Sequence, residues 1–323
     1  MDGFIGGRME AVLSGEGISA ADAARLIDVP DDLLGDLCRC AGQITGAFCG
    51  DDVDVEQLHN IKRDACSEDC TFCAQSALYD TGTTFNLPAI PEVVEGARRA
   101  KEAGSQSYCL VAAWREPPPD GFEQVCRMVS LIRRDVGIEV ECSLGFLTPE
   151  RASRLRGLGV RRYNHNLETA RSKFAEICTT HTYDDRLRTL RIAREAGLEL
   201  CTGGIIGLGE ERGQRLELLL DVARLDPEEV TINMLVPVPG TPLELQPVLG
   251  EREILRVFAV ARFLMPGSVI KASGGREASL PDGGAALLRS GASGLITGGY
   301  LTRGGNSPRE DAEVIRRARA AGA

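Results

Sequence analysis

Short apolar or β-branched runs alternate with longer amphipathic stretches along the chain from about residue 60 onward. Such runs predict buried strands, and the stretches between them, with apolar residues at helical spacing, predict helices. Several helical stretches end at glycine, for example 101–104 and 194–197, and glycine is the usual residue after a helix C-terminus. The predicted strands cover residues 59–63, 107–112, 138–143, 161–166, 199–206, 229–235, 268–273 and 294–297.

Eight strand and helix pairs indicate an α/β protein with a (β/α)8 TIM-type barrel, whose functional groups lie at the C-terminal ends of the strands. An open doubly wound sheet is the alternative. Its Gly-x-Gly-x-x-Gly loop after the first strand is absent, because this loop carries cysteines instead. Upstream, residues 21–28, which follow Ser19, and residues 31–48 have helical spacing. We therefore expect a short N-terminal helical cap over residues 1–50 and a barrel domain over residues 51–323.

Composition narrows the class of protein. The 323 residues are 43% hydrophobic with a mean hydropathy of -0.09, and no apolar run approaches the roughly 18 residues of a membrane span. The first residues lack the basic and then apolar layout of a secretory signal, so we expect a cytoplasmic protein without a membrane partner. The net charge of -10, without a stripe of basic residues, argues against nucleic acid and favours a small-molecule partner.

Three cysteines, Cys66, Cys70 and Cys73, lie with C-x3-C-x2-C spacing on the loop after the first predicted strand. In a cytoplasmic chain such cysteines are more often thiols, metal ligands or catalytic groups than disulfides. A structural zinc site normally has four ligands, and no second cysteine pair follows. Buried free thiols and a zinc loop are the alternatives. Clustered thiolates are what iron and sulfide select, so the loop predicts a four-iron four-sulfur (4Fe–4S) cluster with one iron open to another ligand.

The segment "CSEDCTFCAQS", residues 66–76, resembles the motif of the radical S-adenosylmethionine (SAM) superfamily and, within it, of the biotin synthase family. In that family the open iron binds the amino and carboxylate groups of SAM, and an electron from the cluster cleaves SAM to a 5′-deoxyadenosyl radical. The resemblance implies that five residues contact SAM, with Glu168 at its ribose: Phe72, Ala112, Glu168, Arg186 and Ile205. The alternatives are loop packing for Phe72 and a surface charge for Arg186. At Glu168 the family often has Asp, so the carboxylate that contacts the ribose is displaced here by one methylene.

Further cysteines lie on three predicted strands, at Cys109, Cys142 and Cys201. A single cysteine on a strand is usually a small buried hydrophobic residue, but three such residues can converge inside a barrel. Arg276, after the seventh strand, adds a cation whose alternative role is a salt bridge. Together these four resemble the ligands of the auxiliary two-iron two-sulfur (2Fe–2S) cluster of biotin synthases, thought to donate sulfur to the product. Cys178 is either a further ligand, in which case the cluster is larger, or a buried thiol.

Polar residues end the fourth predicted strand in "YNHNLET", and they are costly in a barrel interior unless they are hydrogen-bonded. The resemblance implies that Asn164, Asn166 and Asn233 contact the substrate, although a satisfied core amide is the alternative for Asn233. It also places a carboxylate site at Thr302 and Arg303, where the family has paired threonines and where an arginine suits a carboxylate.

Acid–base and hydrolytic chemistry lack their usual residues, because the chain has three histidines and no Gly-x-Ser-x-Gly motif. No side chain is therefore predicted to be a catalytic acid, base or nucleophile. The resemblance implies an enzyme that converts dethiobiotin to biotin by sulfur insertion, with reduced flavodoxin or ferredoxin as electron donor and a homodimeric assembly. The alternatives are another radical SAM enzyme of this subfamily, such as a hydrogenase maturase or a methylornithine synthase, and a non-catalytic iron–sulfur scaffold.

Overall fold

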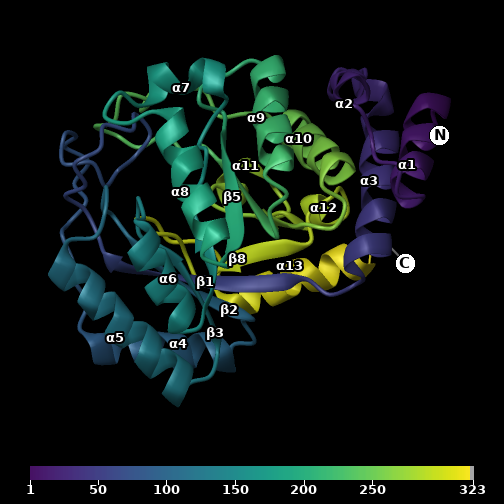
Figure 1. Cartoon of the computed structure of the whole chain (residues 1–323). Coiled ribbons are helices and arrows are strands. Elements are labelled where there is room, and N and C mark those ends of the chain that lie inside the picture. The colour runs from purple at the N-terminus through teal and green to yellow at the C-terminus, as the bar shows by residue number, and fades with distance from the viewer. Residues whose placement is uncertain (321–323) are drawn as a thin grey trace.

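A closed barrel of parallel strands forms the centre of the protein, with the strands in chain order around it (Figure 1). The computed structural model describes residues 1–320. This architecture confirms the α/β barrel predicted from the sequence. The strands are β1 (Asp54–Lys62), β2 (Ser107–Ala112), β3 (Glu139–Ser143), β4 (Val160–Asn164), β5 (Glu199–Ile206), β6 (Glu229–Met234), β7 (Val269–Ala272) and β8 (Gly294–Thr297).

Helices surround the barrel and alternate with its strands along the chain. None of the helices between residues 1 and 320 is long and apolar enough to span a membrane. The helices that precede the barrel are α1 (Gly3–Leu13), α2 (Ala20–Ile27), the 3-10 turn η1 (Asp31–Leu33) and α3 (Leu34–Cys49). The others are α4 (Ile90–Glu102), α5 (Pro119–Asp135), α6 (Pro149–Gly157), α7 (Arg171–Ile177), α8 (Tyr183–Glu195), α9 (Arg212–Arg224), α10 (Glu251–Leu264), α11 (Arg276–Ser279), α12 (Ala285–Leu288) and α13 (Pro308–Ala320).

The N-terminal helices lie on the outside of the helical layer. Ser19 caps α2 through a capping box with Asp22, as its position before the helical stretch predicted. Helix α3 packs on α10, and α2 packs on α9 and α10 (Figure 1). Among the described residues, none before Asp54 lines the cavities described below. These helices therefore support the side of the barrel instead of covering its open end, and the domain boundaries 1–50 and 51–323 stay a prediction.

The inner and outer faces of the strands differ sharply in polarity. Carboxylate oxygens of Glu56, Glu141 and Glu229 lie within 4.8 Å of one another inside the barrel. On the outer face Leu110 and Cys142 belong to the apolar core between the strands and the helices. Successive strand residues point to opposite faces, so this alternation decides which cysteines reach the interior.

Candidate active site

The cysteine motif lies on the long loop between β1 and α4, which folds back on itself. The Cys66 amide donates to the Gln75 carbonyl at 2.9 Å, and the Ala77 amide donates to the Cys66 carbonyl at 2.8 Å. Within the motif, the Cys73 amide donates to the Cys70 carbonyl at 2.9 Å. These bonds hold the three cysteines on one compact loop at the C-terminal end of β1.

The three thiols carry their protons while no metal is bound. Burial raises the pKa of Cys66 and raises that of Cys73 to about 11. A hydrogen bond with Cys178, followed by burial, raises the pKa of Cys70. Metal binding requires thiolates and therefore releases these protons. Three soft donors on one loop fit a 4Fe–4S cluster that leaves one iron without a protein ligand.

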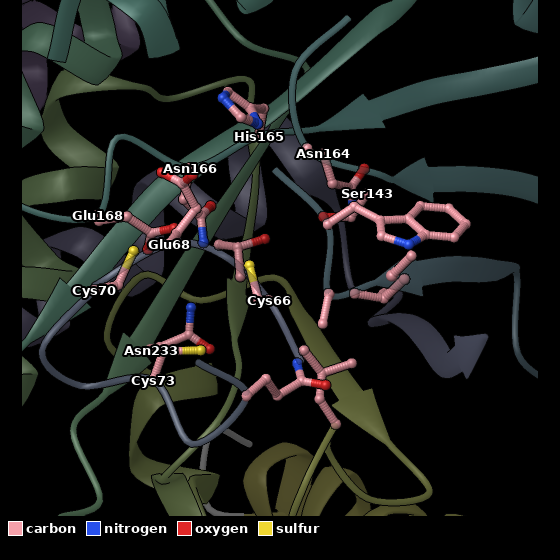
Figure 2. A pocket seen from close by; sticks show the side chains of 18 of the residues that line it. Cys66, Glu68, Cys70, Cys73, Ser143, Asn164, His165, Asn166, Glu168 and Asn233 are labelled. Carbon is pink, nitrogen blue, oxygen red and sulfur yellow. The ribbon is translucent and has the colours of Figure 1, made fainter. Parts of the chain in front are cut away.

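A cavity of about 330 Å³ lies at the C-terminal ends of the strands, and the cysteine loop forms part of its wall (Figure 2). In Figure 2, Glu168 and Asn166 lie on the same side as Cys70, and Asn164 and His165 approach from β4. The cysteine loop and the polar end of β4 therefore border one space. The predicted residues that line it are Cys66, Cys70, Phe72, Cys73, Cys109, Ala112, Asn164, Asn166, Glu168, Arg186, Cys201, Ile205 and Asn233.

A second cavity, of about 320 Å³, adjoins the first between the segments that follow β6, β7 and β8. The two cavities share several wall residues, among them Phe72, Ile205 and Asn233. Thr302 and Arg303, predicted to hold a carboxylate, line this second cavity. Together the two cavities give room for two ligands side by side, one at the cysteine loop and one toward Arg303.

Arg186 on α8 fixes the polar end of β4. Arg186 Nη1 donates to the backbone carbonyl of Asn166 at 2.8 Å and to the Glu168 carboxylate at 3.1 Å. Glu168 approaches β5 so closely that a Cβ on Gly204 would lie 2.5 Å from the Glu168 carbonyl oxygen. Glycine at position 204 is therefore required for this contact. The arrangement holds the Glu168 carboxylate at the cavity wall.

The two asparagines nearest the barrel interior differ in their hydrogen bonding. The side-chain oxygen of Asn233 accepts from the backbone amide of Gly274 at 3.0 Å, and its side-chain nitrogen donates to the backbone carbonyl of Gly204 at 3.4 Å. The Asn164 amide lies 3.5 Å from Cys109 Sγ, and Asn164 Oδ1 is buried without a partner among the described residues. A buried acceptor without a partner costs free energy, so Asn164 is the asparagine better suited to bind a donor group of a ligand.

Two acidic residues inside the cysteine motif fasten the loop to the segment between α7 and α8. Asp69 accepts from the amides of Thr179 and Thr180 at 2.9 and 3.1 Å. Glu68 pairs with Arg115 at 2.9 Å and with His181. The sequence assigned roles only to the cysteines and to Phe72 of this motif, and the structure adds that Glu68 and Asp69 position the loop.

Cys178 lies beside the cysteine loop. Its Sγ is 3.1 Å from Asp69 Oδ1, and its donor atom lies within 4.8 Å of those of Cys70 and His181. A hydrogen bond from Cys70 lowers the pKa of Cys178 to about 5. Cys178 is absent from the lining of the described cavities, whereas Cys109 and Cys201 line the first one. Cys178 therefore lies beside the cysteine loop, and its role as an auxiliary ligand stays a prediction.

Two further predicted auxiliary ligands also point elsewhere. Cys142 is fully buried in the apolar core between strands and helices, next to Leu110 and Tyr163 in strand register. Arg276 is buried against Asp311 of α13 at 2.6 Å, which is the salt bridge considered as its alternative. Of the predicted set of Cys109, Cys142, Cys201 and Arg276, only Cys109 and Cys201 line the cavity, and the set as a whole stays a prediction.

His165 and His181 line the cavity although the sequence assigned them no role. Arg186 Nε donates to His181 Nε2 at 3.0 Å, which leaves the His181 proton on Nδ1, facing Glu68. Nothing in the spacing of these histidines indicates that both line one cavity.

His165 is expected to make stability depend on pH. Burial holds its pKa well below the ordinary 6.5, so the folded protein excludes a proton that the unfolded chain binds below that pH. Stability from this group is therefore present above pH 6.5 and lost as the pH falls below it. We expect the free energy of unfolding of the metal-free protein, measured with denaturant, to fall between pH 7.5 and pH 5.5. The fall should be about 1 kcal/mol smaller in His165→Gln than in the parent. Equal losses would contradict a neutral buried imidazole.

Comparison with known proteins is consistent with this geometry. A family model described as the radical SAM superfamily matches residues 61–223, and one described as the biotin and thiamin synthesis associated domain matches residues 231–319. Over 313 residues the chain is 64% identical to the biotin synthase of Nitrosopumilus maritimus, covering 97% of this chain and 96% of that protein. The chain belongs to the biotin synthase family. The biotin synthase of Cenarchaeum symbiosum is 61% identical over 310 residues, covering 96% of each chain.

Solved structures outside the biotin synthase family share the fold. A methylornithine synthase has a TM-score of 0.85 at 20% identity, covering 98% of this chain and 96% of its own. A maturase of the FeFe-hydrogenase has a TM-score of 0.85 at 18% identity, covering 99% of this chain and 75% of its own. At these identities the likeness concerns the fold alone. Membership of the radical SAM superfamily implies a 4Fe–4S cluster and SAM, and the cysteine loop fits that cluster.

Proposed function

We propose that this member of the biotin synthase family converts dethiobiotin to biotin by inserting sulfur between two carbon atoms. The observation that carries the proposal is the 64% identity to a biotin synthase over nearly the whole chain, joined to a cysteine loop and two inward thiols on one cavity. Bound at Cys66, Cys70 and Cys73, the 4Fe–4S cluster with SAM would supply a 5′-deoxyadenosyl radical able to remove hydrogen from C9 and C6 of dethiobiotin.

The residues of this chain have three tasks in that reaction. Glu168, held by Arg186, is placed to accept from the ribose of SAM, and Phe72 and Ile205 offer apolar surface to its adenine. Asn164 offers its unpartnered oxygen to the ureido N–H groups of dethiobiotin. Arg303 faces the adjoining cavity, where a guanidinium suits the carboxylate tail.

The sulfur source is an auxiliary iron–sulfur cluster in this proposal, bound through Cys109 and Cys201. Dependence on reduced flavodoxin or ferredoxin, the homodimer and the cytoplasmic location stay predictions. Hydrogenase maturases and methylornithine synthases are the rivals, since they share the barrel. A non-catalytic scaffold is the other rival.

The deciding experiment incubates the anaerobically reconstituted protein with SAM, a reductant and dethiobiotin, and follows 5′-deoxyadenosine and biotin by mass spectrometry. We expect both products, with biotin appearing only when dethiobiotin is present. Deoxyadenosine without biotin would favour another radical SAM reaction. Absence of both from protein with a full complement of iron would indicate a scaffold.

Replacing Arg186 by Lys is expected to weaken SAM binding about tenfold, because an ammonium group cannot bond Glu168, Asn166 and His181 together in the planar geometry of a guanidinium. The dissociation constant of SAM, measured on the reconstituted protein, tests this. Arg188→Lys is the control on the same helix, since Arg188 pairs with Asp185 at the surface. Equal constants for the two variants would contradict the role given to Arg186.

A further inference from the structure

Beneath the cavity, the barrel interior holds a layer of charged side chains. Arg162 bonds Glu141 at 2.7 Å and Glu229 at 2.6 Å. Lys271 bonds Glu56 at 2.7 Å and Glu229 at 2.6 Å. All five side chains are at most 4% exposed. Charges this deep persist only where partners compensate them.

The compensation is incomplete. Among the described residues, Glu56 Oε1, Glu141 Oε2 and Glu229 Oε1 are buried without a hydrogen-bond partner. A buried acceptor without a partner costs on the order of 1–3 kcal/mol, and a charged one costs more. Buried groups of this kind call for a further binding partner, such as an ion or a bound group. The layer therefore has acceptor oxygens, able to bind an ion or a hydrogen-bond donor, that the protein itself does not use.

Strand register places two thiols at this layer. Cys109 on β2 pairs with Glu141 on β3, and Cys201 on β5 pairs with Glu229 on β6. Residues paired in register on neighbouring strands point to the same face, so each thiol lies beside a carboxylate inside the barrel. Cys142, one residue after Glu141, points to the opposite face and packs in the outer apolar core.

Glu229 bonds both Arg162 and Lys271, and Glu56 bonds Lys271 but pairs in strand register with Ser107. Glu141 bonds Arg162 alone of these two cations and pairs in register with Cys109, which makes it the glutamate best suited to act as a ligand beside a thiol. Its second oxygen is the one without a partner. Carboxylates serve as iron ligands alongside softer donors.

We infer that the auxiliary iron–sulfur cluster of this chain is held by Cys109, Cys201 and the carboxylate of Glu141, with Glu141 in the place expected of Cys142. The inference rests on the proposed function for the presence of an auxiliary cluster. The inference goes beyond the proposed function because it replaces a thiolate ligand by a harder oxygen ligand, at a position set by strand register.

The test reconstitutes the full-length protein with 57Fe and sulfide under anaerobic conditions and compares variants by Mössbauer spectroscopy and iron content. In the parent protein we expect iron beyond that of the SAM-binding cluster. Cys142→Ala should keep all of this extra iron and leave its spectrum unchanged. Glu141→Gln should lose at least half of it, and Glu141→Cys should retain it with an isomer shift moved toward that of a site with thiolates alone.

Glu199→Gln is the matched control, because Glu199 also bonds Arg162, at 2.9 Å, yet lies partly exposed and does not belong to the group of buried glutamates. Its extra iron should equal that of the parent. Loss of the extra iron in folded Cys142→Ala, or an unchanged spectrum in Glu141→Gln, would overturn the inference. Because Cys142 lies outside the charged layer, its variant gives an answer even if the Glu141 variants fail to fold.

The outcomes also separate this inference from the proposed function. A parent protein that forms biotin while Glu141→Gln keeps an unchanged spectrum refutes the ligand assignment alone. A parent protein that holds the extra iron and loses it in Glu141→Gln, but makes no biotin, refutes the proposed function alone. A parent protein without extra iron refutes the inference, and SAM cleavage by the same sample shows that reconstitution succeeded.

Discussion

Replacing any one of Cys66, Cys70 or Cys73 by Ala is expected to abolish the formation of 5′-deoxyadenosine from SAM. Each thiol would hold one iron of the cluster, so the two thiols that remain in a variant would leave a second iron without a protein ligand. The product should fall below detection, which is at least about a thousandfold and corresponds to roughly 4 kcal/mol. Anaerobic reconstitution followed by a timed SAM cleavage assay measures this.

Cys126→Ala is the matched control, since Cys126 is a buried thiol of helix α5 and lines neither of the cavities described above. It should keep the cluster absorption and the cleavage rate. Undiminished SAM cleavage in any of the three loop variants would contradict the assignment of the loop, whatever the fate of biotin formation.

Replacing Cys201 by Ala is expected to separate the two halves of the reaction. Cys201 lines the cavity from β5, close to Thr231 at 3.0 Å, and is not part of the cysteine loop. SAM cleavage should therefore continue within a few fold of the parent rate. Biotin formation should fall by about a hundredfold or more, which is at least the loss expected on disturbing a metal site. Quantification of both products in a single-turnover reaction is the measurement.

Cys142→Ala supplies the contrast for this prediction. The sequence alone assigned Cys142 the same role as Cys201, but its side chain packs between the strands and the helices. We expect its biotin yield to stay within a few fold of the parent. A yield as low as that of Cys201→Ala would restore the original assignment.

The strands and their order were predictable because apolar runs and helix-spaced stretches alternate regularly. Strands β2, β5 and β8 begin and end at the residues predicted. Strand β1 begins at Asp54, five residues before the predicted start at 59. Asp54 and Glu56 hid this part of the strand, because their charges are compensated by Lys271, which lies more than two hundred residues away in the chain.

The predicted role of Cys142 and its position in the structure diverge for a physical reason. The resemblance assigned Cys142 to the auxiliary cluster without deciding to which face of the strand its side chain points. In this barrel the interior is charged and the outer face of the strands is apolar, so Glu141 points inward and Cys142 points to the helices. Hydrophobic periodicity identifies the two faces of a strand, but it does not say which face encloses the reaction.

Arg276 and Cys178 were out of reach of sequence reasoning for another reason. Their partners, Asp311 and Cys70, are distant in the chain and are brought close only by the closed barrel. The cysteine loop, by contrast, was predictable because its three ligands are local and their spacing alone carries the chemistry.

The charged barrel interior and the apolar layer outside the strands have different tasks. The interior carries the site, and the apolar layer stabilises the fold. The apolar residues between the strands and the helices form the hydrophobic core around the barrel, so the inward-facing positions serve the site more than they serve that core. Proteins only 18–20% identical to this one share the fold. This is expected of a fold that depends on its apolar layer more than on the identity of the inward-facing residues.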